Sequence, residues 1–131
     1  MKYKTEVLNL RGGRRVFLID FQNEKYDALT SFFNEEVVSF GDDVKKSIMR
    51  VLSGEENEFF FRGNLNIIEI TPQTTTVIEL YGKEAGKEVD RCEVDTRKLL
   101  RAVNWWSDFV CKWKRTGERE DIDGLTGELD L

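Results

Sequence analysis

Acidic side chains are the residues of this sequence with the clearest capacity for chemistry, because the chain contains no histidine. Carboxylates gather at Glu35–Glu36, at Asp42–Asp43 and over residues 55–58, while Glu69 and Glu79 interrupt apolar segments. Two carboxylates can share acid and base work when one occupies an apolar pocket and the other stays solvated. The sequence marks no such asymmetry, and an alternating strand normally turns residues like Glu69 and Glu79 to water. Surface carboxylates are therefore favoured over a catalytic pair.

Other catalytic and cofactor-binding patterns are missing. Without histidine, the chain cannot form a serine or cysteine triad, the zinc-protease helix motif or an imidazole metal site. The glycine-rich phosphate and dinucleotide motifs and the G-x-S-x-G motif are also absent. Cys92 and Cys111 are too far apart for a C-x-x-C site, so two reduced thiols are expected. We therefore predict a protein that is not an enzyme and has no cofactor and no metal.

The net charge of −5 is concentrated at the C-terminus. Residues 116–131 carry six acids against one base, while residues 1–115 carry 19 of each. The six acids of this C-terminal arm are Glu118, Glu120, Asp121, Asp123, Glu128 and Asp130. Net acidity argues against nucleic-acid and anionic-membrane partners, and it suits a basic protein partner. The arm either packs loosely on the body, extends as a solubilising tail, or docks in a basic groove of that partner.

The adjacent pair Trp105–Trp106 is a second candidate contact. Neighbouring helix positions point about 100° apart, so both rings can enter the core only if the helix is deeply buried. Packing of one ring at the edge of the core is the favoured interpretation. The alternative is an exposed anchor, since tryptophan is enriched at interface hot spots.

The elements that must position these residues begin with a hairpin over residues 2–10 and 14–21, with Gly12–Gly13 in its turn. A short amphipathic helix is predicted over 24–34, with Asn23 as its cap. A second short helix is predicted to begin at Asp42–Asp43 and to end at Gly54. The residues between these two helices carry no clear pattern.

The second half of the chain predicts a sheet followed by a helix. Residues 58–62, 65–70, 74–81 and 87–94 are rich in β-branched and aromatic side chains, and turn residues separate them. They predict an antiparallel meander with Cys92 and Val94 on one face. A long helix capped by Asp95 or Thr96 follows, with a stop at Gly117. Its apolar stripe should cover the sheet and consists of Leu99, Val103, Trp106, Val110 and Trp113.

Together these elements predict a single α+β domain over residues 1–131. It would comprise an N-terminal hairpin, two short helices, an antiparallel meander and a long C-terminal helix packed on the sheet. No apolar segment approaches the roughly 20 residues of a membrane span, and the N-terminus has no apolar leader. A cytoplasmic protein without a membrane partner is expected.

The middle of the chain resembles a known family. The segments that carry the resemblance are Ser53-Gly54-Glu55, Phe61-Arg-Gly63-Asn64-Leu-Asn-Ile-Ile-Glu69-Ile70-Thr-Pro72, the Thr-rich strand, Cys92-Glu-Val-Asp-Thr96, Leu99-Leu100 and Trp106. In layout and spacing, residues 50–115 are similar to small bacterial immunity proteins of polymorphic and contact-dependent growth-inhibition toxin systems. The resemblance implies a cytosolic protein that binds one cognate toxin domain, often a nuclease, and blocks it without chemistry.

The leading hypothesis is therefore an immunity-type binding protein that occludes a basic, nuclease-like toxin domain. The six arm acids and one ring of Trp105–Trp106 would contact that partner. A regulatory domain that acts through self-association or complex assembly is the alternative. A carboxylate-dependent enzyme or ligand-binding protein is the third hypothesis, and it would require a deep pocket around Glu69 or Glu79.

Overall fold

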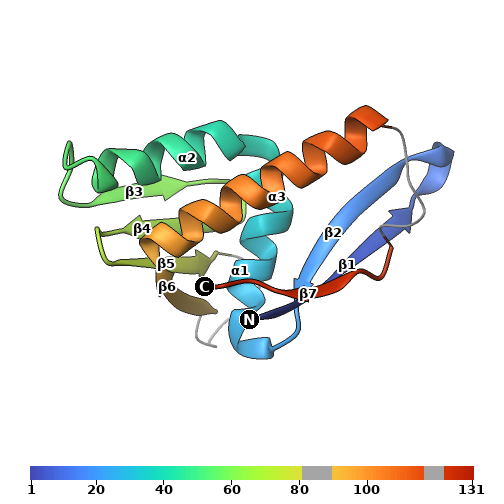
Figure 1. The fold of residues 1–131 in the computed structure, drawn as a ribbon, viewed down its shortest axis with the longest axis horizontal. Coiled ribbons are helices and arrows are strands. Elements are labelled where there is room, and N and C mark those ends of the chain that lie inside the picture. The colour runs from blue at the N-terminus through green and yellow to red at the C-terminus, as the bar shows by residue number, and fades with distance from the viewer. Residues whose placement is uncertain (81–89, 117–122) are drawn as a thin grey trace.

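Two antiparallel sheets and a set of helices make up the computed structural model, which describes residues 1–80, 90–116 and 123–131. One sheet has three strands in the order β2-β1-β7, and the other has four in the order β3-β4-β5-β6. The longest helix, α3, crosses in front of the body between the two sheets (Figure 1). This architecture confirms the predicted α+β class, with a hairpin, a meander and a long C-terminal helix.

The three-stranded sheet starts with the predicted hairpin of β1 (Lys2–Asn9) and β2 (Arg15–Phe21). Its turn is a single 3-10 turn over Arg11–Gly13, in which Gly12 has φ +80° and Gly13 has φ +78°. Both values lie in the left-handed region that glycine tolerates best, as the Gly-Gly pair predicted. The third strand, β7 (Thr126–Glu128), pairs with β1 antiparallel and comes from the C-terminal arm.

The helices after β2 form one continuous run. A 3-10 turn (η2, Glu24–Tyr26) leads into α1 (Asp27–Phe32), a π-helix (η3, Phe33–Val37) and α2 (Val38–Leu52). The predicted cap is confirmed, because Asn23 Oδ1 accepts a hydrogen bond from Lys25 N. The structure assigns α2 from Val38, but Phe40 (φ −131°, ψ 31°) has non-helical dihedral angles and kinks the run. The regular part of α2 therefore begins close to the predicted start at Asp42–Asp43.

The π-helix joins the two predicted helices and buries Phe33 and Val37 in the core. A π-helix carries one extra residue per turn relative to an α-helix, which shifts the apolar positions that follow. A strict 3.6-residue period therefore breaks here although the backbone stays helical. The predicted end of the helix is confirmed, since Gly54 follows α2 with φ +83°.

The four-stranded sheet is the predicted meander of β3 (Phe59–Arg62), β4 (Asn66–Ile70), β5 (Thr74–Glu79) and β6 (Arg91–Asp95). Burial alternates along its strands, so one face packs on the core and the other is open to solvent. Cys92 and Val94 both lie on the buried face, as predicted. Residue 81 and residues 87–89 of the predicted strands lie outside the described residues.

The long helix α3 (Thr96–Thr116) begins where it was predicted, because Asp95 Oδ1 accepts a hydrogen bond from Lys98 N at 2.9 Å. All five residues of the predicted apolar stripe are buried: Leu99, Val103, Trp106, Val110 and Trp113. The predicted stop at Gly117 lies outside the described residues. The stripe thus fixes which face of α3 turns to the core.

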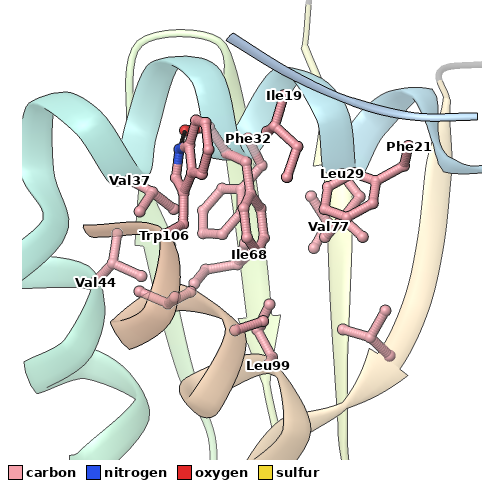
Figure 2. Close-up of a cluster of buried hydrophobic side chains, with 14 of the residues drawn as sticks. Ile19, Phe21, Leu29, Phe32, Val37, Val44, Ile68, Val77, Leu99 and Trp106 are labelled. Atoms are coloured by element: carbon pink, nitrogen blue, oxygen red, sulfur yellow. Dashed lines mark hydrogen bonds between the residues drawn. The ribbon is translucent and has the colours of Figure 1, made fainter. Parts of the chain in front are cut away.

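Side chains from both sheets and from the helices meet in one core. Figure 2 shows Ile19 and Phe21 of β2 on one side, Ile68 and Val77 of the meander on another, and Trp106 of α3 among them. The two ends of the chain lie close together, with the C-terminal arm running beside β1 (Figure 1). None of the helices in the described part of the chain has the length and hydrophobicity needed to cross a membrane.

Candidate partner-binding surfaces

The described part of the C-terminal arm is a structural element of the first sheet. Besides the strand pairing of β7, Thr5 N donates to Leu125 O at 2.8 Å and Leu129 N donates to the carbonyl of the first residue at 2.8 Å. Asp123, one of the predicted contact acids, accepts a hydrogen bond from Val7 N at 2.9 Å. Residues 123–131 therefore pack on the body and do not extend from it as a free tail.

The other described acids of the arm lie among positive charges. Asp130 accepts from Lys98 Nζ at 2.9 Å. This hydrogen bond holds the pKa of Asp130 below its ordinary value, and the charges of Lys98, Arg101 and the N-terminal amine act in the same direction. Glu128 is exposed and lies opposite Lys2 in the register of β7 and β1. Two of the three described arm acids, Glu128 and Asp130, therefore have basic residues nearby in the fold.

Three of the six predicted contact acids, Glu118, Glu120 and Asp121, lie outside the described residues. The structure accordingly places Asp123, Glu128 and Asp130 only, all along one edge of the three-stranded sheet.

The two tryptophans of α3 have different environments. Trp106 is 0% exposed, and its Nε1 donates to Phe33 O at 3.0 Å, so its ring belongs to the core. Trp105 is half-buried, with its ring centroid 5.2 Å from that of Tyr3 and 5.8 Å from that of Phe109. The expected split between a core ring and a ring at its edge is confirmed. Trp105 is the ring of this pair that a partner could touch.

Tyr3 connects Trp105 to the arm. A Cβ at Gly127 would lie 2.6 Å from the hydroxyl oxygen of Tyr3, so only glycine lets β7 approach this ring. The ring contacts Trp105 on the other side. The structure therefore brings Trp105 and the β7 segment of the arm into one surface, which we call the arm surface and define by Trp105, Asp123, Glu128 and Asp130.

The expectation of surface carboxylates is wrong for Glu36, which is buried in the π-helix. Glu36 is 0% exposed; its Oε1 accepts from Asn64 N at 2.7 Å and its Oε2 from Leu65 N at 3.2 Å. Burial raises the pKa of Glu36, while the backbone N–H groups work in the opposite direction. Because both oxygens are held by backbone donors of the β3–β4 turn, Glu36 fixes this turn to the helices and has no free oxygen directed at a substrate.

Glu69 and Glu79 do not form the pocket that an enzyme would need. Glu69 is exposed on the open face of the meander, and Glu79 is only half-buried at the end of β5. The fully buried acid among the described residues is Glu36 instead.

The open face of the meander carries the most exposed large apolar side chain of the described residues, Phe60, at 58% exposure. Strand pairing places Phe60 opposite Glu69, Glu69 opposite Thr76, and Thr76 opposite Glu93. A shallow hollow of about 280 Å³ lies along this row, with Glu58 at its border. We call this region the outer sheet face, defined by Glu58, Phe60, Glu69, Thr76 and Glu93.

One sequence signal could have located this face. Phe59, Phe60 and Phe61 are consecutive, and successive residues of a strand point to opposite sides. With Phe59 and Phe61 half-buried against the core, Phe60 must point outward. The carboxylates beside it come from other strands, and only the pairing register brings them together.

A wider groove of about 760 Å³ lies between the start of α2 and the C-terminal half of α3. Phe40, Ser107 and Cys111 are among its lining residues, and the Ser107 hydroxyl oxygen is buried without a hydrogen-bond partner. Its charged lining residues are three acids and three lysines: Asp42, Asp43, Asp108, Lys45, Lys46 and Lys114. The charge of the groove is balanced, so it has no electrostatic preference for a basic or an acidic partner.

Comparison with known proteins gives one match that spans nearly the whole chain. An immunity protein from Bacillus cereus is 31% identical over 120 residues, which cover 92% of this chain and 98% of that protein. No protein-family model matches the chain. No solved structure gives a significant match. The aligned length extends well beyond residues 50–115, where the resemblance was noted, and confirms it.

Proposed function

This chain belongs to the family of the Bacillus cereus immunity protein, and from that membership we propose that it binds a toxin protein and neutralises it. The observation that carries the proposal is the match itself, which covers 92% of the chain. A match of this extent spans both sheets and the helices between them. The function is therefore proposed for the whole fold.

The proposed mechanism is occlusion without catalysis. The fully buried Glu36 is engaged by backbone donors, and the chain offers no histidine for acid–base work. An inhibitor needs only a surface complementary to the toxin in shape and charge, which blocks access to the toxin's active site. The net charge of −5 supports a basic target. A nuclease domain is the target class we propose, because enzymes that act on nucleic acids carry positive charge to bind phosphates.

The contact residues predicted from the sequence remain part of this proposal. They are Glu118, Glu120, Asp121, Asp123, Glu128 and Asp130 of the arm, with the Trp105–Trp106 pair. Of that pair, Trp105 has the ring surface that a partner can reach, since Trp106 is fully buried.

Co-expression tests the function directly. A candidate toxin domain, sought among the neighbouring genes, is expressed in a sensitive host with and without the chain, and growth and complex formation are measured. We expect restored growth and a stoichiometric complex on size exclusion. A toxin domain from an unrelated system serves as the control and should remain lethal. Continued growth arrest without a complex would contradict the proposal, and a stable homodimer of the chain alone would then favour self-association.

A further inference from the structure

The outer sheet face has no covering element in the described structure. The buried side chains of β4 and β5, such as Ile68 and Val77, point to the helices, and the residues between them point away. Figure 2 shows side chains of the helices, such as Leu29 and Phe32, in the same buried cluster as Ile68 and Val77. A four-stranded sheet thus presents one complete face to solvent, which is ordinary for an antiparallel sheet with a polar outer face.

The outer sheet face is not uniformly polar, because Phe60 stands on it. Its 58% exposure exceeds that of the other large exposed apolar side chains among the described residues, such as Met49 at 49%. A phenylalanine on the solvent side of a strand loses most of the free energy that its burial would contribute. Aromatic side chains at this kind of position are enriched in protein interfaces, where a partner removes them from water.

Three carboxylates line the hollow with Phe60. Arg62 and Arg91 lie on the same face of the sheet but are not among the residues that line the hollow. Glu58, Glu69 and Glu93 have neither an ion pair nor a side-chain hydrogen bond within the described parts of the chain. Glu69 and Glu93 are two strands apart, so their attachment points are separated by about 10 Å. Like charges at this spacing repel each other weakly at physiological salt, so this pair does not stabilise the fold. Their charge is available to a partner, unlike that of Asp130.

The hollow beside Phe60 fits a single side chain. Its volume of about 280 Å³ is below the range of roughly 300–1,000 Å³ that is usual for small-molecule sites. An arginine or lysine side chain could lie in it, with its charge near Glu69 and Glu93 and its stem or guanidinium against the ring of Phe60. This combination of ring and carboxylates is complementary to a basic protein surface.

We propose that the outer sheet face is the docking surface for the toxin, with a basic side chain of the toxin seated in the hollow between Phe60, Glu69 and Glu93. This inference rests on the proposed function, because the occupant is the toxin protein. It places the principal contact on the meander rather than on the arm surface. Phe60 would contribute buried apolar area, while the carboxylates would steer association and orient the basic side chain.

The test uses the same candidate toxin domain as the probe, with binding kinetics measured by surface plasmon resonance. Phe60→Ala should weaken binding at least tenfold, mainly through faster dissociation. The double variant Glu69→Lys/Glu93→Lys should slow association at least tenfold at low salt, with a smaller effect at high salt. Glu69→Gln/Glu93→Gln should also slow association at low salt, but by a smaller factor. This variant provides the test if the lysine variant folds poorly.

Two further variants locate the surface. Met49→Ala removes a similarly exposed apolar side chain on α2 and should leave binding unchanged. Asp20→Lys reverses an exposed charge on β2, outside both named surfaces, and should change binding less than twofold. Wild-type kinetics for the three outer-sheet variants would overturn the inference while the proposed function stands. If the wild-type chain itself fails to bind this toxin domain, both proposals fall.

Discussion

The contact between Glu36 and Gly63 allows a double-mutant test of how the meander is held to the helices. A Cβ at Gly63 would overlap the Glu36 carboxyl group, and the three atoms nearest to that Cβ all belong to Glu36. The carboxylate cannot move aside easily, because Asn64 N and Leu65 N hold its two oxygens. Gly63→Ala should therefore destabilise the fold by about 1–3 kcal/mol, the usual cost of overpacking a well-packed site.

The same substitution should lose its cost once the carboxylate is removed. Gly63 does not have a positive φ, so its backbone suits alanine. In a Glu36→Ala background, Gly63→Ala should be neutral or stabilising by up to about 1 kcal/mol, since alanine restricts the unfolded chain more than glycine does. Glu36→Ala alone should cost about 2–4 kcal/mol, because it leaves two backbone N–H groups without their acceptor.

The assay is urea unfolding followed by tryptophan fluorescence for the wild type, both single variants and the double variant. The expected coupling energy is about 2 kcal/mol, far above the scatter of about 0.3–0.5 kcal/mol for independent sites. The slope of the unfolding free energy against urea concentration should be the same in all four proteins, which would show that they unfold in the same way. An equal cost of Gly63→Ala in both backgrounds would refute the overlap as the reason for glycine at this position.

Three further predictions concern buried groups. Because burial raises the pKa of Glu36 above the ordinary value of 4.5, the folded chain keeps this proton to higher pH than the unfolded chain. The difference in unfolding free energy between the wild type and Glu36→Ala should therefore shrink as pH rises above about 4.5 and then level off. Urea unfolding midpoints at a series of pH values measure this difference, and a difference that grows with pH would contradict the prediction. Burial raises the pKa of Cys92 to about 11, while Cys111 is exposed. A thiol reagent at about pH 8 should therefore label one thiol in the native chain and two after unfolding. In native Cys111→Ser it should label no thiol rapidly. Trp106→Phe removes a buried indole and its hydrogen bond to a carbonyl of the π-helix. It should lower the free energy of unfolding, measured by heat or urea, by about 2–4 kcal/mol. A loss below about 1 kcal/mol would show that the site repacks.

The elements that sequence analysis predicted correctly are those specified by local patterns. The meander and α3 follow strand and helix periods closely, and the caps at Asn23 and Asp95 depend on side chains adjacent to the helices. The turn at Gly12–Gly13 likewise depends on residues within the turn. Each of these features is determined by residues within a few positions of one another, which is the range that a periodicity argument covers.

The elements that were missed depend on partners distant in the chain. The β7 segment, Thr126–Glu128, has little intrinsic strand preference and is extended because β1 offers it backbone hydrogen bonds. The π-helix turns Glu36 toward Asn64, which is 28 residues away. Neither the pairing nor the extra residue in the helical turn has a signal in the local sequence.

The spatial arrangement of charge also depends on contacts between distant parts of the chain. Counting along the chain assigns the whole negative excess to residues 116–131, yet Asp130 meets Lys98 and Arg101 in space. Conversely, Glu69 and Glu93 are neighbours on a face only because β4, β5 and β6 pair in the observed register. The net charge of a segment describes the electrostatic potential at its surface only when no residues of opposite charge lie next to that segment in the fold.

The alternation of the meander gives a physical reason to prefer the outer sheet face over the arm surface for a variable partner. Phe60 and Phe61 are adjacent in sequence, but Phe61 packs against the core and Phe60 does not. Residues of the outer sheet face can therefore change to suit a different toxin without removing a contact inside the fold. Changes at Asp130 or Trp105 would break contacts with Lys98 or Tyr3 and so alter the fold together with the interface. The proposed docking surface therefore uses side chains that do not also stabilise the fold.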